Sequence, residues 1–252
     1  MESFDNTHFL AFGDGEQPIY WAHGWGQSHK AFLPWAERFK AFGKHILLDF
    51  AGHGASPIPP TAWGTEDYAD EAAKLIKARE DGKPVIWVGH SFGCRVGLQL
   101  AARHPELIAG LCLIAGAGLK RKRSLWQRLY FGGRIKLFKL LKKLIPLGLS
   151  QDWLYTKFGS PDYKSAGEMR KIFVKVVNED LSEVAQQIQC PVTLIYGSDD
   201  QETPPEIGER LHKLIKNSKL IVLDGFDHYT LLSSGQHQAA GHLDNLIKSV
   251  KS

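Results

Sequence analysis

Short apolar runs alternate with segments of helical periodicity along most of the chain. The runs end at Gly, Pro or Asp and favour buried β-strands. They fall at 19–22, 45–50, 85–88, 111–115, 192–196 and 220–223, and a run at 8–12 predicts an antiparallel first strand. Helical patterns fall at about 30–41, 66–80, 92–103, 206–215 and 236–250. This alternation predicts an α/β fold, a mostly parallel sheet with helices on both faces.

The alternation stops between about Lys120 and Asp180. This stretch has helical patterns but no convincing core strand. We interpret residues 119–180 as a helical insertion after the sixth strand. Residues 1–118 and 181–252 then form one core domain, which suits a chain of 252 residues.

Positive charge is concentrated in the insertion. Residues 120–143 contain ten Lys and Arg and no Asp or Glu; since the whole chain carries +4, the remainder carries −6. Residues 134–145 are amphipathic, with Lys136, Lys139, Lys142 and Lys143 on one side. Three interpretations stay open: the apolar side packs on the core, the helix lies on an anionic membrane surface, or it docks an acidic partner such as an acyl carrier protein. No nucleic-acid recognition motif is present, so we expect no nucleic-acid partner.

Composition favours a cytoplasmic protein. The N-terminus has neither a basic nor an apolar signal region, and no run of eighteen apolar residues occurs. Three cysteines, Cys94, Cys112 and Cys190, do not all pair and are expected to be reduced.

The pentapeptide at 89–93, Gly-His-Ser-Phe-Gly, follows an apolar run and opens a helical pattern. This G-x-S-x-G context predicts a nucleophile elbow, a tight strand-to-helix turn that needs glycine on both sides and exposes the serine hydroxyl. Ser91 is therefore the candidate nucleophile. A base, an acid that orients it and oxyanion donors are required as well.

Two later loops supply the acid and the base. The strand run at 192–196 is followed by Gly-Ser-Asp-Asp-Gln-Glu-Thr-Pro, and the run at 220–223 by Asp-Gly-Phe-Asp-His. Ser91, a loop with two acids (Asp199 and Asp200) and His228 thus each follow a predicted strand, in the chain order serine, acid, histidine.

With two further segments, these motifs resemble the α/β-hydrolase family over nearly the whole chain. His23-Gly24-Trp25-Gly26 is similar to the family's oxyanion loop, and residues 49–56 to its D-x-x-G-x-G-x-S loop. The resemblance implies that Ser91 is the nucleophile, His228 the general base and Asp200 the orienting acid. It implies an oxyanion hole from the backbone N–H groups of Trp25 and Phe92, and it makes the insertion a lid that roofs the active site.

Other acidic residues and histidines could take the roles of Asp200 and His228. Asp199 adjoins Asp200, but the family's G-x-x-D spacing from Gly197 selects Asp200. Asp227 is a second rival, beside His228. Among the other histidines, His23 and His53 are expected to brace loops, and His90 to point away from the Ser91 side chain.

The resemblance implies a serine hydrolase that cleaves carboxylic esters or thioesters through an acyl-enzyme. Substrate-binding candidates are Trp25, Phe92, Trp126, Phe138 and Trp153, which would form an apolar acyl or aryl pocket. The oxyanion loop and the basic segment are also similar to those of carboxylesterases that cleave pimeloyl methyl ester on a carrier protein.

No metal or cofactor is expected. The chain has no H-E-x-x-H or C-x-x-C motif and no nucleotide-binding glycine loop. Carbon–carbon bond hydrolysis, perhydrolysis and a ligand receptor with little turnover stay open as alternatives, because all occur on the same fold with the same triad.

Overall fold

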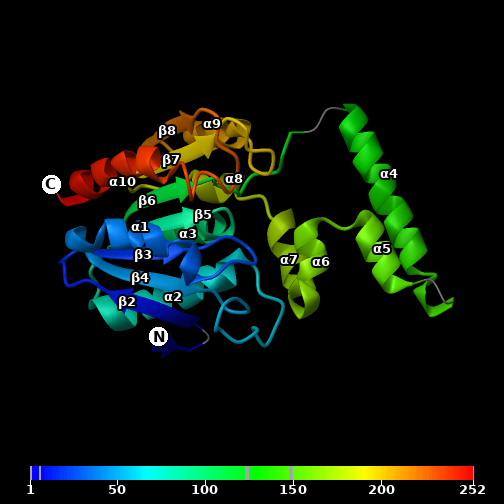
Figure 1. The fold of residues 1–252 in the computed structure, drawn as a ribbon, viewed down its shortest axis with the longest axis horizontal. Helices are drawn as coiled ribbons and strands as arrows, with labels where there is room; N and C mark the ends of the chain where they lie inside the picture. Colours follow the sequence, from blue (N-terminus) through cyan, green and yellow to red (C-terminus); the bar gives the residue numbers. More distant parts are fainter. Residues whose placement is uncertain (1, 6, 123–124, 148–149, 252) are drawn as a thin grey trace.

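The structure, a computed structural model, describes residues 2–5, 7–122, 125–147 and 150–251. Its centre is an eight-stranded sheet with strand order β1-β2-β4-β3-β5-β6-β7-β8 (Figure 1). β1 and β2 are antiparallel to their neighbours, and the other strands are parallel. The strands are β1 (Glu2–Phe4), β2 (Thr7–Phe12), β3 (Pro18–Ala22), β4 (Lys44–Asp49), β5 (Val85–His90), β6 (Ile108–Ile114), β7 (Val192–Gly197) and β8 (Ser218–Leu223).

Helices cover both faces of the sheet because side chains alternate along each buried strand. In β3, Ile19 and Trp21 belong to the core on one face, together with side chains of α1 and α10. Tyr20 and Ala22 belong to the core on the other face, with side chains of α2, α3 and α9. The core helices are α1 (Leu33–Arg38), α2 (Thr65–Glu80), α3 (Phe92–Arg103), α8 (Ser182–Ala185), α9 (Pro205–Leu214) and α10 (Gln236–Lys251). The predicted α/β-hydrolase fold is confirmed.

Two elements differ from the sequence-based expectation. The helix expected at 30–41 is shorter: α1 lies between single 3-10 turns at His29–Ala31 and Lys40–Phe42. Pro34 stands in its first turn, where a missing N–H is tolerated, and this favours a helix start there. β1 is an edge strand of three residues, which is too short to be recognised from a hydrophobic pattern.

The insertion lies between β6 and β7 and carries α4 (Leu125–Lys142), α5 (Gln151–Phe158), α6 (Pro161–Ser165) and α7 (Arg170–Asn178). Its two ends meet: the N–H of Leu181 donates to the carbonyl of Gly118, at 2.9 Å. We propose residues 119–180 as the bounds of this unit, since the contact closes the segment on itself.

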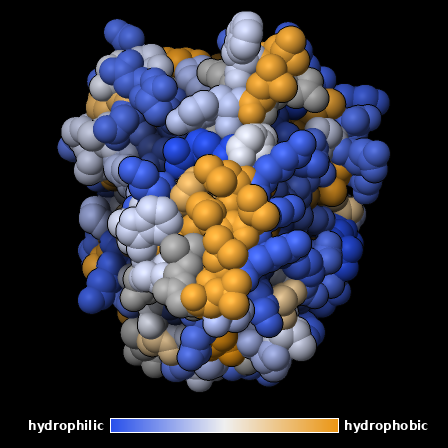
Figure 2. Space-filling view, turned by 90° about the vertical axis from the view of Figure 1, so that its right-hand side faces the viewer, coloured by the Kyte–Doolittle hydropathy of each residue, from blue (hydrophilic) through white to orange (hydrophobic). Residues whose placement is uncertain are grey.

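Only part of the insertion lies over the core. Figure 1 shows α6 and α7 beside the sheet, whereas α4 and α5 project away from it. Figure 2 shows the face on that side, where an apolar stripe is bordered by hydrophilic side chains. Leu129 and Leu140 of α4 are each 60% exposed, and Leu144 is 41% exposed. The interpretation that the apolar side of this segment packs on the core is therefore wrong.

Among the helices that the structure describes, none is long and apolar enough to cross a membrane.

Candidate active site

Ser91 occupies a strained turn between β5 and α3. Its φ is 49° and its ψ is −102°, a conformation that a residue with a side chain rarely adopts. A Cβ on Gly93 would overlap the carbonyl of Ala22, and one on Gly89 would lie 2.7 Å from the backbone of Gly93. Only glycine fits at both positions, as the G-x-S-x-G pattern predicts. The turn places Ser91 in the wall of a cavity at the carboxyl edge of the sheet.

The loops after β7 and β8 bring an acid and an imidazole together. Oδ2 of Asp200 lies 2.8 Å from Nδ1 of His228, and both side chains are buried. Oδ1 of Asp200 accepts the N–H groups of Glu202 and Thr203, each at 2.8 Å. An ionised Asp200 is an acceptor, so Nδ1 carries the proton and Nε2 is left as the basic nitrogen.

Hydrogen bonds keep Asp200 ionised despite its burial. Burial acts to raise the pKa of the carboxyl, but the bonds and charge of His228 and the bonds from Thr203 outweigh it and lower the pKa. The neighbouring Asp199 is exposed, and its side chain accepts from Ser198. Asp227 accepts the N–H groups of Tyr229 and Thr230. Asp200 is therefore the carboxylate that faces the imidazole.

The side chain of His90 contacts the loop that carries His228. Its Nε2 lies 3.0 Å from the carbonyl oxygen of His228, and the two rings are 4.8 Å apart. Burial lowers the pKa of His90 to about 3, so the ring is neutral and its Nε2–H donates to that oxygen. Nδ1 of the same ring lies 3.3 Å from Oε1 of Gln27, so His90 ties the loops that carry His228 and Gln27 to the elbow strand.

The other ring nitrogen of His228 faces the acidic side of the cavity. Nε2 lies 3.5 Å from Oε2 of Glu202. Within the described residues, no hydrogen bond joins this nitrogen to Ser91 Oγ. In unliganded hydrolases this bond is often long and tightens only when substrate binds.

Two backbone N–H groups, one in the oxyanion loop and one at the start of α3, have no acceptor in the described structure. The N–H of Gln27 donates to Gly24, and the side chain of Gln27 accepts the N–H of Gly24 in return. The N–H groups of Trp25 and Phe92 have no acceptor among the described residues. Phe92 is the first residue of α3, where N–H groups are unpaired and the helix dipole favours negative charge.

His23 braces this loop, as expected. Its Nε2 accepts the N–H of Phe50 at 3.1 Å, and its Nδ1 lies 2.7 Å from the carbonyl of Gly24. Burial lowers the pKa of His23 to about 3, which keeps the acceptor nitrogen unprotonated. The neutral ring therefore connects the loops after β3 and β4.

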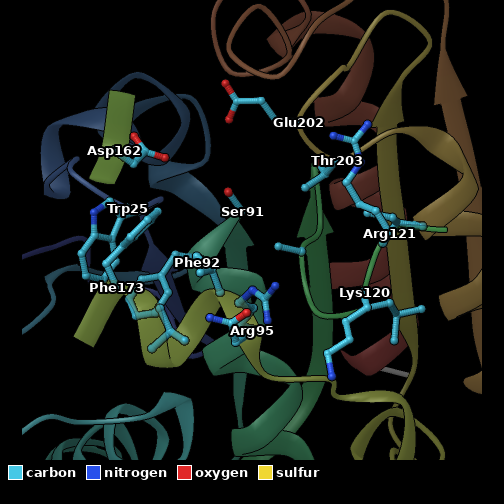
Figure 3. Close-up of a pocket in the computed structure, with 16 residues that line it drawn as sticks. Trp25, Ser91, Phe92, Arg95, Lys120, Arg121, Asp162, Phe173, Glu202 and Thr203 are labelled. Carbon is cyan, nitrogen blue, oxygen red and sulfur yellow. The ribbon is translucent and has the colours of Figure 1, made fainter. Parts of the chain in front are cut away.

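A cavity of about 460 Å³ lies beside Ser91 (Figure 3). Its apolar wall includes Trp25, Phe92 and Phe173, whose rings pack with centroids 5.1–5.5 Å apart around Trp25. Charged side chains also line it: Arg95, Lys120, Arg121, Asp162 and Glu202. Burial raises the pKa of Asp162. The predicted apolar pocket thus has a strongly polar component that apolar patterning does not reveal.

The five substrate-binding candidates lie in three different places: two line the cavity at Ser91, one lines a second cavity, and two are exposed. Trp25 and Phe92 line the cavity at Ser91. Phe138 lines a second cavity of about 420 Å³ between α4 and α7, which shares Phe173 and Val177 with the first. Trp126 is 81% exposed and Trp153 is 50% exposed, and neither lines these two cavities. The insertion therefore meets the site through α6 and α7, whereas α4 and α5 do not roof it.

Residues without a motif also contribute to the site. Thr203, Glu202 and Asp162 come from loops or short helices whose approach to His228 depends on the tertiary fold. Arg95 does have a sequence signal, because it follows Ser91 by four residues on a helix and therefore lies one turn further along the same side. Among the described residues, no group of three or more His, Cys, Asp or Glu could hold a metal ion.

Comparison with known proteins identifies the family of the chain. Residues 19–240 match the model of the alpha/beta hydrolase family. The chain belongs to this family.

Two curated relatives are similar along nearly their whole length. The pimeloyl-[acyl-carrier protein] methyl ester esterase of Neisseria meningitidis serogroup C is 29% identical, over 92% of this chain and 94% of the relative. The (E)-2-((N-methylformamido)methylene)succinate hydrolase of Acinetobacter baylyi is 26% identical, over 90% and 89%. Such names agree with the prediction of a carboxylesterase-type enzyme.

Solved structures share the fold. A thermophilic esterase from Thermogutta terrifontis superposes with a TM-score of 0.72, at 17% identity, over 98% of this chain and 94% of the other. A meta-cleavage product hydrolase from Pseudomonas fluorescens superposes with a TM-score of 0.71, at 18% identity, over 96% and 94%.

Proposed function

We propose that the chain is a serine esterase that cleaves carboxylic esters or thioesters through an acyl-enzyme on Ser91. The observation that carries the proposal is the hydrogen bond of 2.8 Å between Asp200 and His228, at the same sheet edge as the strained turn of Ser91. The name of the relative from Neisseria meningitidis, a methyl ester esterase, supports ester hydrolysis as the reaction.

The proposed reaction begins with attack of Ser91 Oγ on the ester carbonyl carbon. Nε2 of His228 takes the hydroxyl proton, while Asp200 keeps the imidazole in the required tautomer and stabilises its charged form. The N–H groups of Trp25 and Phe92 receive the negative oxygen. His228 then returns the proton to the leaving alcohol, and water cleaves the acyl-enzyme by the same steps. Loss of one such N–H donor typically raises the barrier by about 3 kcal/mol.

The test is hydrolysis of p-nitrophenyl esters from acetate to laurate by wild type and Ser91→Ala. Wild type should show an optimum chain length, and Ser91→Ala should lose nearly all turnover while it stays folded. Ser233→Ala, at an exposed serine, is the control and should keep the wild-type rate. Equal rates in wild type and Ser91→Ala would refute the nucleophile. Turnover only of a carbon–carbon substrate, or ligand binding without turnover, would favour the alternatives.

We further propose that α4 docks an acidic carrier protein that presents the ester. Its exposed apolar side chains include Ile135 and Leu140, and four exposed lysines lie on the same segment: Lys136, Lys139, Lys142 and Lys143. A relative named for an acyl-carrier-protein substrate supports a carrier protein over a membrane. An acidic partner suits this charge, because complementary charge speeds association.

The kinetic test compares a carrier-bound ester with the same free ester. Changing the four lysines to Gln should lower kcat/KM for the carrier-bound ester at least tenfold and leave the free ester within about twofold, since each lost charge weakens docking by a few tenths to one kcal/mol. Equal losses on both substrates would contradict docking. Lysine-dependent sedimentation with anionic liposomes, with no carrier effect, would instead assign the surface to a membrane.

A further inference from the structure

The cavity at Ser91 contains a buried cation without an ion-pair partner. Arg95 is 9% exposed and lines the cavity one turn along α3 from Ser91. Its one hydrogen bond in the described structure is from Nη1 to the carbonyl of Glu179, at 3.3 Å. No carboxylate of the described residues lies within 4.0 Å of its guanidinium. A guanidinium has five N–H donors, so most of them are available to a bound group.

The nearby carboxylate is engaged elsewhere. Glu179 accepts the N–H and the hydroxyl of Thr65 at the start of α2. Glu179 and Asp180 lie close enough to favour the charged form of Arg95, but burial has the larger effect and lowers its pKa. A buried charge that is not directly paired is costly, and a bound anion in the cavity would offset that cost.

Two further cations line the same cavity. Figure 3 shows Arg95 and Lys120 on one side of Ser91 and Glu202 and Asp162 on the opposite side, whereas the guanidinium of Arg121 extends toward Thr203 and Glu202. The potential therefore falls across the cavity from the Arg95 side to the Glu202 side. An anionic group on a substrate would be drawn toward Arg95 and repelled from the two carboxylates.

We propose that Arg95, with Lys120 on the same side of Ser91, is a subsite for a carboxylate carried by the substrate itself. The preferred substrates are then half esters of short dicarboxylic acids, such as monomethyl succinate or glutarate. Arg95 and Ser91 line one cavity of about 460 Å³, so the anion and the ester carbonyl belong to one small molecule. The proposal rests on the proposed esterase function and not on carrier docking, because a half ester whose other carboxyl is joined to a carrier keeps no free carboxylate.

The test uses two substrates of equal length, monomethyl glutarate and its neutral analogue methyl glutaramate. The measured quantity is the ratio of their kcat/KM values within each variant, which cancels losses common to both substrates. Wild type should favour the carboxylate about tenfold or more, as one charge-assisted hydrogen bond implies. Arg95→Met should lower this ratio to near one. Arg95→Lys, which keeps the charge but not the planar fork, should lie between them and serves if Arg95→Met does not fold.

Arg103→Met is the matched control, on the last turn of the same helix, where Arg103 pairs with Asp70 at 2.7 Å outside the cavity. It should leave the ratio at the wild-type value. A wild-type ratio near one, or a high ratio that survives in both Arg95 variants, would overturn the subsite. If either result occurs while hydrolysis still depends on Ser91, the subsite is refuted but the proposed esterase function is not.

A binding measurement separates the two proposals if no ester is turned over. Calorimetry would compare monomethyl glutarate with the neutral methyl glutaramate on wild type and on Arg95→Met. Binding of monomethyl glutarate at least tenfold tighter to wild type than to Arg95→Met, with no such difference for methyl glutaramate, supports the subsite while the esterase function fails. Equal affinity in the two proteins refutes the subsite.

Discussion

Thr203 Oγ1 lies 2.9 Å from Oδ2 of Asp200, the same oxygen that faces the histidine. The hydroxyl is also 3.0 Å from the carbonyl of Ala115 and 3.2 Å from Nδ1 of His228. It is buried and belongs to the loop whose N–H groups hold the other Asp200 oxygen. Thr203 is thus a positioning residue that fixes the carboxylate against the imidazole.

Thr203→Val should lower kcat about tenfold with little change in KM. The substitution keeps the shape of the side chain, which also lines the cavity at Ser91, but removes the hydroxyl that lies between Asp200 and the carbonyl of Ala115. Thr203→Ser should restore most of the rate. Steady-state kinetics of the three proteins would check this; a rise in KM alone would show that Thr203 contacts substrate instead.

Asp200→Asn should lower kcat by about 10³–10⁴, because the amide can donate to Nδ1 and stabilise the wrong tautomer of His228. Asp199→Asn, one residue earlier and exposed, is the control and should stay within about twofold of wild type. Hydrolysis of the optimum p-nitrophenyl ester measures both. The reverse order of losses would assign the acid to Asp199.

Stability should fall as pH is lowered from about 6.5. Burial lowers the pKa of His23 from 6.5 to about 3, so the unfolded chain binds the extra proton first. The stabilisation by neutral His23 is complete above pH 6.5, its pKa in the unfolded chain. It is lost progressively as the pH falls toward about 3, its pKa in the folded protein. Each such histidine contributes a slope of about 1.4 kcal/mol per pH unit.

Urea unfolding at pH 7, 6 and 5 would measure this slope. His23→Gln should lower stability at pH 7, because the pair of bonds to Phe50 and Gly24 is disturbed, but its slope should be shallower. His212→Gln, made at an exposed imidazole, provides the comparison. An unchanged slope in His23→Gln would contradict the neutral state of that ring.

Gly93→Ala should destabilise the fold by about 3 kcal/mol or more, since the new methyl group would overlap the backbone of Ala22, which has no freedom to move aside. Gly241→Ala is the matched control on α10, where a Cβ meets no atom within 4 Å. It should stabilise the protein by about 0.5–1 kcal/mol. Thermal unfolding of both variants shows whether the loss of stability comes from the contact of the new methyl group with Ala22 or from replacement of glycine as such.

The sequence predicts the site best where chemistry depends on chain order and turn geometry. Gly89 and Gly93 mark the elbow because no other residue fits, and the loops of Asp200 and His228 follow strands that hydrophobic runs define. These are local constraints, and local pattern reveals them. The sheet and its two helical layers follow for the same reason.

The sequence pattern says less about where a helix or side chain lies in the folded protein. The amphipathic period of α4 is compatible with a helix on the core or with an exposed one, and only the structure shows Leu140 exposed. Trp126 and Trp153 illustrate the same point, because aromatic content does not tell which side of a helix faces a site. The spacing of Arg95 from Ser91 places it near the site, but its burial and its single hydrogen bond among the described residues are seen only in the structure.

The wall shared by the two cavities has a consequence for substrate length. Phe173 and Val177, both on α7, face the space at Ser91 and the apolar space beside Phe138. A smaller side chain at either position should widen the connection between these two spaces. For the proposed esterase, the bulk of two residues on one helix then limits the acyl group, so a single substitution there should lengthen the preferred chain without any change at the reacting atoms.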